Sequence, residues 1–322
     1  MAIARRAIQG LPKDFAQTAA NQLATLYAEA AKTIKERAEQ RLLRGKGLTA
    51  EATRSRALLI EVQAILAQLD SDAAKLVSDM IPKAYRVGLT KANRGLAELG
   101  FKAGPVPFDL KFHGNAIDLL MIDMQGRLLE VSKGVMKNFR TTLTRTQTRR
   151  ALDKLITKEI ATGSIAGKTV REVGKGIEQT IINEFGDKPL TINGRQYNVQ
   201  KYAELVARTK TREAVTNATV NRMVETGNDL VVVTAHGAKD GCGFFEGKVF
   251  SISGTSERYP PLNSIPRGGP PFHPRCVHNL APFVDSRASG AEKRAGARID
   301  KSARKLIQGQ RPFKEFEKLA AA

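Results

Sequence analysis

Two cysteines and two histidines near the C-terminal end of the chain are of the types that bind transition-metal ions. They are Cys242, His273, Cys276 and His278. Two thiolates and two imidazoles form a ligand set typical of a tetrahedral structural zinc site. The two-residue gap between His273 and Cys276 lets both side chains reach one ion. His278 follows Cys276 with one residue between them, and its side chain is expected to point away. His236 could then take its place as a ligand. One interpretation of the sequence is therefore a zinc cofactor bound at these four residues.

The same stretch also allows a structural interpretation without metal. Because the chain has only 2 cysteines among 322 residues, a disulfide framework is not expected. A single Cys242–Cys276 bond stays open as an alternative, as do reduced thiols packed in a core beside hydrogen-bonded histidines. The N-terminal stretch lacks the long apolar region of a secretory signal, and no apolar run reaches the roughly 18 residues of a membrane span. We therefore expect the chain to stay in a reducing cytoplasm.

An enzymatic interpretation of the stretch can also be drawn. Cys276 could act as a nucleophile with His273 or His236 as base and Asp240 as the orienting group. A metal-free nuclease could instead use His236, His273 and Arg275. Neither arrangement comes with a nucleophile turn or an oxyanion loop, and the sequence has no phosphate-binding loop and no carboxylate cluster. We therefore do not expect an enzyme.

The charge of the chain points to an anionic partner. The 52 basic and 32 acidic side chains give a formal net charge of +20. Nucleic acid, an acidic protein surface and an anionic membrane are the candidate partners, although any one cation could simply be solvated on a helix face. The candidate contacts fall in the basic stretch 137–150 and in the C-terminal tail. They are Lys137, Arg140, Arg145, Arg149, Arg150, Arg294, Arg298, Lys301, Arg304 and Lys305.

Apolar residues at helical spacing dominate the first two thirds of the chain. The stripe from Phe15 to Ile34 predicts a first helix, and glycines 45 and 47 end it. A second helix is expected from near Thr49, and a third from Ser71 or Asp72, which are good N-caps. Pro82 should kink or break that third helix. The remaining helices are expected from about 115 to 150, from 170 to 185 and from 199 to 225.

The pattern changes after residue 187. The segment LTINGRQYN predicts a hairpin, because Asn193-Gly194 suits a type I′ turn. Short strands are expected at Leu230–Val233, at Lys248–Ile252 and within 277–284, with irregular proline-rich loops between them. The predicted fold class is α+β: a mostly α-helical N-terminal two thirds, a small C-terminal α+β domain and a basic tail. The predicted segments are a helical region 1–100, a long basic helical region 101–186, the α+β domain 187–285 and the tail 286–322.

The C-terminal block resembles the bacteriophage minor capsid and head morphogenesis family, which includes the Mu F-like proteins. The matching pieces are VVVTAHGAKDGC, FFEGKVFSISG and GGPPFHPRCVH, preceded by ARTKTREAVTNA with Arg208, Ala214 and Asn217 in place. The match spans residues 200–285. Lys239 stands where some members have a further cysteine, and Val277 stands where an arginine is usual. These two departures weaken the transfer of a four-ligand metal site.

The resemblance implies a structural minor capsid protein of a tailed bacteriophage. It implies portal protein and the interior of the major capsid protein as partners, non-specific contact with packaged double-stranded DNA, and help in assembly or genome ejection. It also implies a location in the virion, in the head interior or near the portal, and in host cytoplasm during assembly. No membrane partner is expected before ejection. A nuclease or toxin-like domain using the histidine and cysteine cluster is the alternative.

Overall fold

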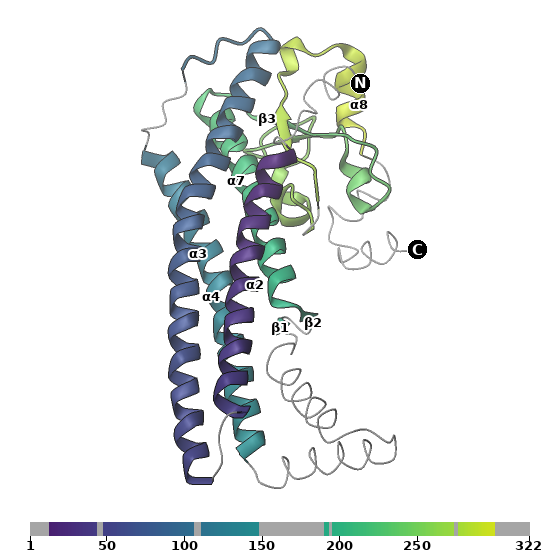
Figure 1. Cartoon of the computed structure of the whole chain (residues 1–322). Coiled ribbons are helices and arrows are strands. Elements are labelled where there is room, and N and C mark those ends of the chain that lie inside the picture. The colour runs from purple at the N-terminus through teal and green to yellow at the C-terminus, as the bar shows by residue number, and fades with distance from the viewer. Residues whose placement is uncertain are drawn as a thin grey trace. The chain divides into compact units, whose positions relative to one another are not determined.

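The computed structural model describes residues 13–43, 48–105, 111–147, 190–192, 195–273 and 276–299. Its helices are α2 (Lys13–Leu43), α3 (Leu48–Glu98), α4 (Lys111–Gln147), α7 (Val199–Glu225) and α8 (Gly290–Ala297). Its strands are β1 (Leu190–Ile192), β2 (Arg195–Tyr197), β3 (Leu230–Val233), β4 (Val249–Ser251) and β5 (Leu280–Pro282). Long helices early in the chain and short strands late in it confirm the α+β class (Figure 1).

The chain divides into two compact units, and each unit is assembled from separate stretches. Unit 1 combines Met1–Ala20, Val77–Met124 and Leu205–Ala322, and unit 2 combines Asn21–Leu76 with Gln125–Glu204. Helices α2, α3, α4 and α7 therefore contribute residues to both units. The four consecutive segments expected from the sequence are not tested by this division and stay predictions.

In unit 2, the helices pack through small and aliphatic side chains. Leu23, Leu58 and Val131 are fully buried. The Tyr27 hydroxyl donates a hydrogen bond to the Leu128 carbonyl at 3.3 Å and so ties α2 to α4. Strands β1 and β2 pair antiparallel in this unit, which confirms the predicted hairpin, and its Asn-Gly turn lies outside the described residues.

One helix replaces the two that were expected between residues 49 and 98. Helix α3 runs without interruption through Ser71, Asp72 and Pro82, so the predicted helix start and the break at the proline were wrong. Asp72 does not cap a helix. Its carboxylate instead accepts hydrogen bonds from Gln68 at 2.9 Å and Lys75 at 3.0 Å along the helix surface. The buried positions 69, 73, 77 and 81 form one continuous stripe, and its burial outweighs the local capping preference.

Helix α4 begins four residues earlier than the predicted Asn115. His113, in its first turn, is fully buried. One ring nitrogen lies 3.0 Å from the Tyr85 hydroxyl and the other 3.2 Å from a Glu225 carboxylate oxygen. These two contacts anchor the first turn of α4 to α3 and α7 within unit 1.

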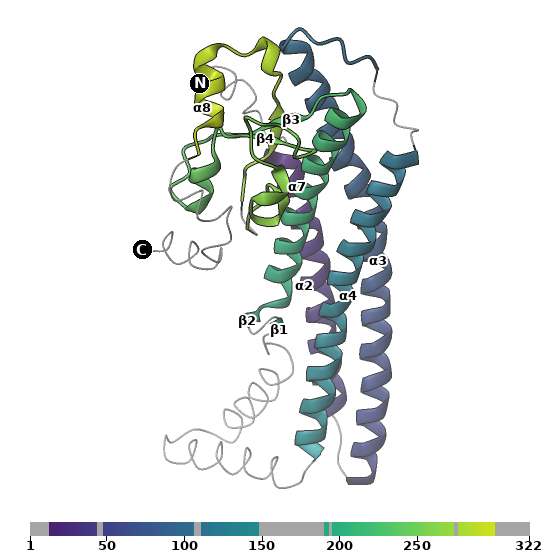
Figure 2. The same cartoon turned by 180° about the vertical axis from the view of Figure 1, so that it is seen from behind.

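The sheet of unit 1 has the strand order β4-β3-β5 and is antiparallel throughout. Val231, in the central strand, pairs with Phe250 on one side and Pro282 on the other. All three strands were predicted from their apolar runs. Helix α7 also has its predicted bounds, and Gly227, at φ +68°, follows its end. Figure 2 shows β3 and β4 beside the upper end of α7.

Several sequence predictions lie outside the described residues. They are the glycine break at 45–47, the helix at 170–185 and the tail beyond residue 299. The linker after α3 is described only as far as residue 105, where it is irregular as expected. Of the helices that the structure describes, none combines the length and apolar character needed to span a bilayer.

Candidate functional site

The predicted metal ligands lie on two segments that meet beside the sheet of unit 1. Cys242 is in a short 3-10 helix, Gly241–Phe245, which follows β3. Asp240 caps that helix, since its carboxylate accepts a hydrogen bond from the Cys242 backbone N–H at 3.0 Å. His273, Cys276 and His278 lie in the proline-rich segment that leads into β5. Strand pairing of β3 with β5 therefore brings residues about 30 positions apart together.

The structure brings all four predicted ligands into one cluster. Potential ligand atoms of Cys242, His273 and Cys276 all lie within 4.8 Å of one another. His278 joins them through Nδ1, which is 3.4 Å from the Cys276 sulfur. Both cysteines are free thiols, so the structure shows no Cys242–Cys276 bond. His236, the predicted replacement ligand, instead groups with Glu246 and His278.

Each histidine of the cluster is held by a carboxylate. His273 Nε2 lies 3.1 Å from Asp240 Oδ2, and His278 Nε2 lies 2.9 Å from Glu246 Oε1. Glu246 is itself fixed, because it accepts hydrogen bonds from the backbone N–H groups of residues 236, 237 and 238 at 3.0–3.1 Å. The two carboxylates therefore set the orientation of both imidazole rings.

The electrostatic environment of the cluster shifts the pKa values of the two thiols in opposite directions. The hydrogen bond from Cys242, together with the neighbouring His278, lowers the pKa of Cys276 to about 4 in spite of burial. That hydrogen bond and burial raise the pKa of Cys242. Burial lowers the pKa of His278, but its contacts with Cys276 and Glu246 outweigh burial and raise it. The cluster thus favours a thiolate at Cys276 beside a protonated imidazole.

This thiolate is shielded from solvent. The contacts run from Cys276 through His278 to Glu246, which is the order of a nucleophile, a base and an orienting carboxylate. Cys276 is only 2% exposed and His278 only 1% exposed. The sulfur belongs to an apolar core cluster that also contains Phe245 and Phe272. A substrate could not reach it in this conformation, so the arrangement suits a structural site better than a nucleophile.

Helix α7 contacts the cluster through a residue of unit 1. The Arg212 guanidinium, on α7, donates a hydrogen bond to the Cys276 carbonyl. Arg212 belongs to the segment ARTKTREAVTNA, which precedes the cysteine block in the sequence and shares the family resemblance. The helix motif and the HPRCVH motif are therefore in direct contact.

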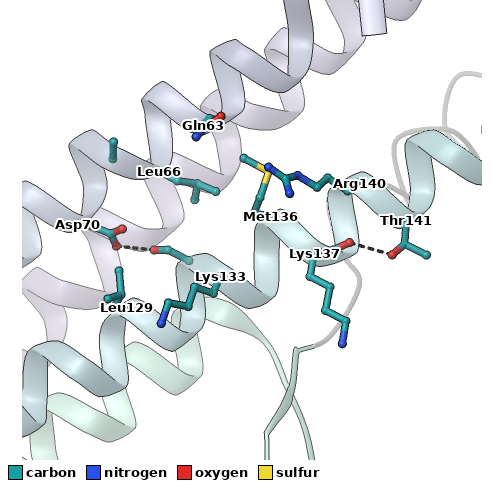
Figure 3. Close-up of a pocket in the computed structure, with 11 residues that line it drawn as sticks. Gln63, Leu66, Asp70, Leu129, Lys133, Met136, Lys137, Arg140 and Thr141 are labelled. Atoms are coloured by element: carbon teal, nitrogen blue, oxygen red, sulfur yellow. Dashed lines mark hydrogen bonds between the residues drawn. The ribbon is translucent and has the colours of Figure 1, made fainter. Parts of the chain in front are cut away.

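Two of the predicted anion contacts line a groove in unit 2. The groove has a volume of about 530 Å³ between α3 and α4. Exposed Lys133, Lys137 and Arg140 come from α4, and Asp70, on α3, accepts a hydrogen bond from Ser132 (Figure 3). The groove therefore combines an apolar floor with a mostly cationic rim.

The structure describes the other predicted anion contacts only in part. Arg145 lies within α4, and its side chain is not described. Arg294 and Arg298 are exposed in and just after α8 of unit 1. The remaining five lie outside the described residues: Arg149, Arg150, Lys301, Arg304 and Lys305.

An exposed apolar stripe on α4 was not predicted. Phe112, Leu119 and Ile122 are 39%, 68% and 65% exposed. Their spacing of seven and three residues places them on one side of the helix in unit 1. On another side of the same helix, Ile117, Leu120 and Met124 are buried. The sequence signal that could have predicted the exposed stripe is a second set of apolar residues at helical spacing in the same part of α4.

Comparison with known proteins adds a family match. The family model described as phage minor capsid protein 2 matches residues 17–313. The match covers nearly the whole chain, including both the helical region and the block that carries the cysteines. No curated protein matches the chain, and no solved structure matches it.

Proposed function

Because the chain belongs to the phage minor capsid protein 2 family, and so has a structural role in a phage particle, we propose that it joins the portal and inner capsid surface of a tailed-phage head and contacts the packaged DNA. The observation that carries the proposal is the family match over residues 17–313. Assistance in head assembly or in genome ejection follows from the same position.

The charge of the chain supports the DNA contact. A net charge of +20 suits a space filled with phosphate, where sequence-independent contacts with lysine and arginine dominate binding. Exposed Lys137 and Arg140 supply such cations on one helix. None of the residues that line the groove beside them is an aromatic on which single-stranded bases could stack, so duplex DNA is the better ligand for this surface.

The exposed stripe on α4 supports the protein contact. Isolated apolar side chains are ordinary on a surface, but three on one side of a helix resemble the anchors with which a helix enters a partner's groove. Phe112, Leu119 and Ile122 therefore form the part of the described surface best suited to a capsid or portal partner.

The proposal is tested by a pull-down of the tagged chain from infected-cell lysate at high salt, with identification by mass spectrometry. High salt removes the phosphate contacts that a basic chain makes with any nucleic acid. We expect portal or major capsid protein to stay bound. The Leu119→Ser/Ile122→Ser variant should lose it, whereas the control Asn115→Ser/Asp118→Ser, at exposed polar positions of the same helix, should retain it. A wild-type chain that retains no head protein would overturn the proposal.

A further inference from the structure

The two histidines of the cysteine cluster share an arrangement that is characteristic of metal ligands. In each ring, Nε2 is engaged by a carboxylate: Asp240 at 3.1 Å for His273 and Glu246 at 2.9 Å for His278. Metal-binding histidines almost always use one ring nitrogen in this way, which fixes the tautomer and leaves the other nitrogen for the ion. In His278 the other ring nitrogen, Nδ1, lies 3.4 Å from the Cys276 sulfur, where an ion would share both atoms.

The spacing of the ligand atoms fits one tetrahedral ion. Zinc–sulfur bonds of about 2.3 Å and zinc–nitrogen bonds of about 2.0 Å require neighbouring ligand atoms to lie roughly 3.5 Å apart. The distance from Cys276 Sγ to His278 Nδ1 is 3.4 Å. Ligand atoms of Cys242, His273 and Cys276 lie within 4.8 Å of one another, so small side-chain rotations close the set.

A competing set of ligands is less suitable. His236, Glu246 and His278 also converge within 4.8 Å. The Glu246 carboxylate already accepts three backbone hydrogen bonds in addition to His278, so its oxygens are occupied. The first set contains two sulfurs, which are the ligands that select zinc over harder ions.

We propose that Cys242, His273, Cys276 and His278 bind one structural zinc ion, with Asp240 and Glu246 orienting the two imidazoles. The ion joins the 3-10 helix after β3 to the segment before β5. All four ligands lie within unit 1, and two of them belong to its apolar core. The site closes with four protein ligands, which leaves no position for a substrate and makes it structural. This inference goes beyond the proposed role in the phage head and is independent of it.

The first test uses the unmodified full-length chain, purified in metal-free buffer. We expect one zinc per chain by elemental analysis, and two thiols per chain in a thiol titration after denaturation. Replacement by Co²⁺ should give the visible absorption bands of a tetrahedral thiolate site. Less than 0.1 zinc per chain after refolding with zinc sulfate, or the absence of titratable thiols, would overturn the proposal.

The second test uses matched variants. Cys276→Ser and His273→Ala should each lower the zinc content at least tenfold, and they should abolish the cobalt bands if a variant stays folded. His236→Ala is the control, because His236 belongs to the competing set, and it should keep one zinc per chain. Asp240→Asn should keep the ion but weaken its affinity about 10–100-fold, as removal of an orienting partner does. Loss of zinc in His236→Ala with retention in Cys276→Ser would contradict the assignment.

Discussion

At the scale of single residues, Arg222 shows how a buried charge positions a loop. Its side chain is 1% exposed. It contacts Glu225 at 2.6 Å and Asn93 at 2.6 Å, and it donates hydrogen bonds to the carbonyls of residues 103, 104 and 105. The planar guanidinium is suited to this task because its five N–H groups diverge in a fixed geometry. Arg222 therefore fastens the segment after α3 to α7 within unit 1.

We predict that Arg222→Ala destabilises the chain by about 1–3 kcal/mol, because Glu225 loses one of its two partners and the carbonyls of residues 103–105 lose a charged hydrogen-bond donor. Urea unfolding followed by circular dichroism measures the effect. Arg94→Ala, at an exposed position of α3, is the matched control and should change the free energy of unfolding by less than about 0.5 kcal/mol. Equal effects of the two substitutions would refute the role given to Arg222.

Asp229 carries a second prediction at this scale. Burial raises the pKa of its carboxyl, but hydrogen bonds from the Ser251 hydroxyl and the Ser253 backbone and side chain outweigh burial, so its pKa lies below the ordinary value. The folded chain therefore releases this proton more readily than the unfolded chain. The resulting stability is present above the unfolded pKa of about 3.9 and is lost as the pH falls through the lower folded pKa.

Asp229→Asn should consequently be less stable than the natural chain at neutral pH. The difference should stay constant down to about pH 5 and should narrow below about pH 4. Thermal unfolding from pH 7 to pH 3 measures it. A difference that stays constant over the whole range would mean that the charge of Asp229 contributes nothing.

The sequence predicted the site ligands better than their supports. Cysteine and histidine are rare here, so their types alone identified Cys242, His273, Cys276 and His278 as a group. Glu246 and Arg212 could not be predicted, because glutamate and arginine are common on solvated surfaces and only the folded structure shows which of them contact the cluster. Whether the four residues bind zinc also remains a prediction.

At the scale of elements, a glycine determines how closely α3 and α7 approach in unit 1. A Cβ placed on Gly88 would lie 2.6 Å from the Ala218 Cβ and 2.6 Å from the Val215 carbonyl oxygen. Glycine in the middle of a helix costs roughly 0.5–1 kcal/mol relative to alanine. The close packing of α3 against α7 offsets this cost.

We predict opposite signs for two glycine-to-alanine substitutions. Gly88→Ala should destabilise the chain by about 1–3 kcal/mol, since the backbone of α7 must move away. Gly114→Ala, in α4, should stabilise it by about 0.5–1 kcal/mol, because no atom lies within 4 Å of the added Cβ. Chemical denaturation measures both. Stabilisation by Gly88→Ala would show that the two helices are not in close contact.

The predicted helix boundaries were correct where the apolar pattern was strong. They were wrong where a local capping signal competed with that pattern. Helix α7 was predicted at its observed bounds because Gly227 ends the pattern. In α3, the capping preference of Ser71 and Asp72 suggested a boundary, but burial of Leu69, Ala73 and Val77 continues the helix. Such packing depends on residues that are distant in the sequence, so local helix and capping preferences do not predict it.

At the scale of the whole molecule, the excess of positive charge leads to a prediction about DNA. The chain should bind duplex DNA without sequence preference and with a steep dependence on salt. Replacing Lys137 and Arg140 by glutamine should reduce the slope of log affinity against log salt by about 2, because each phosphate contact contributes about 0.9. Fluorescence anisotropy measures the slope. The control replaces Lys32 and Lys75, exposed lysines paired with acidic neighbours, and should change the slope less.

The central claim is that the chain is a structural component of a phage head. The most direct test is quantitative mass spectrometry of proheads and mature particles purified through a density gradient at high salt. The account predicts that the chain copurifies with portal and major capsid protein in a fixed ratio that salt does not change. Its absence from particles that are otherwise complete would contradict the account.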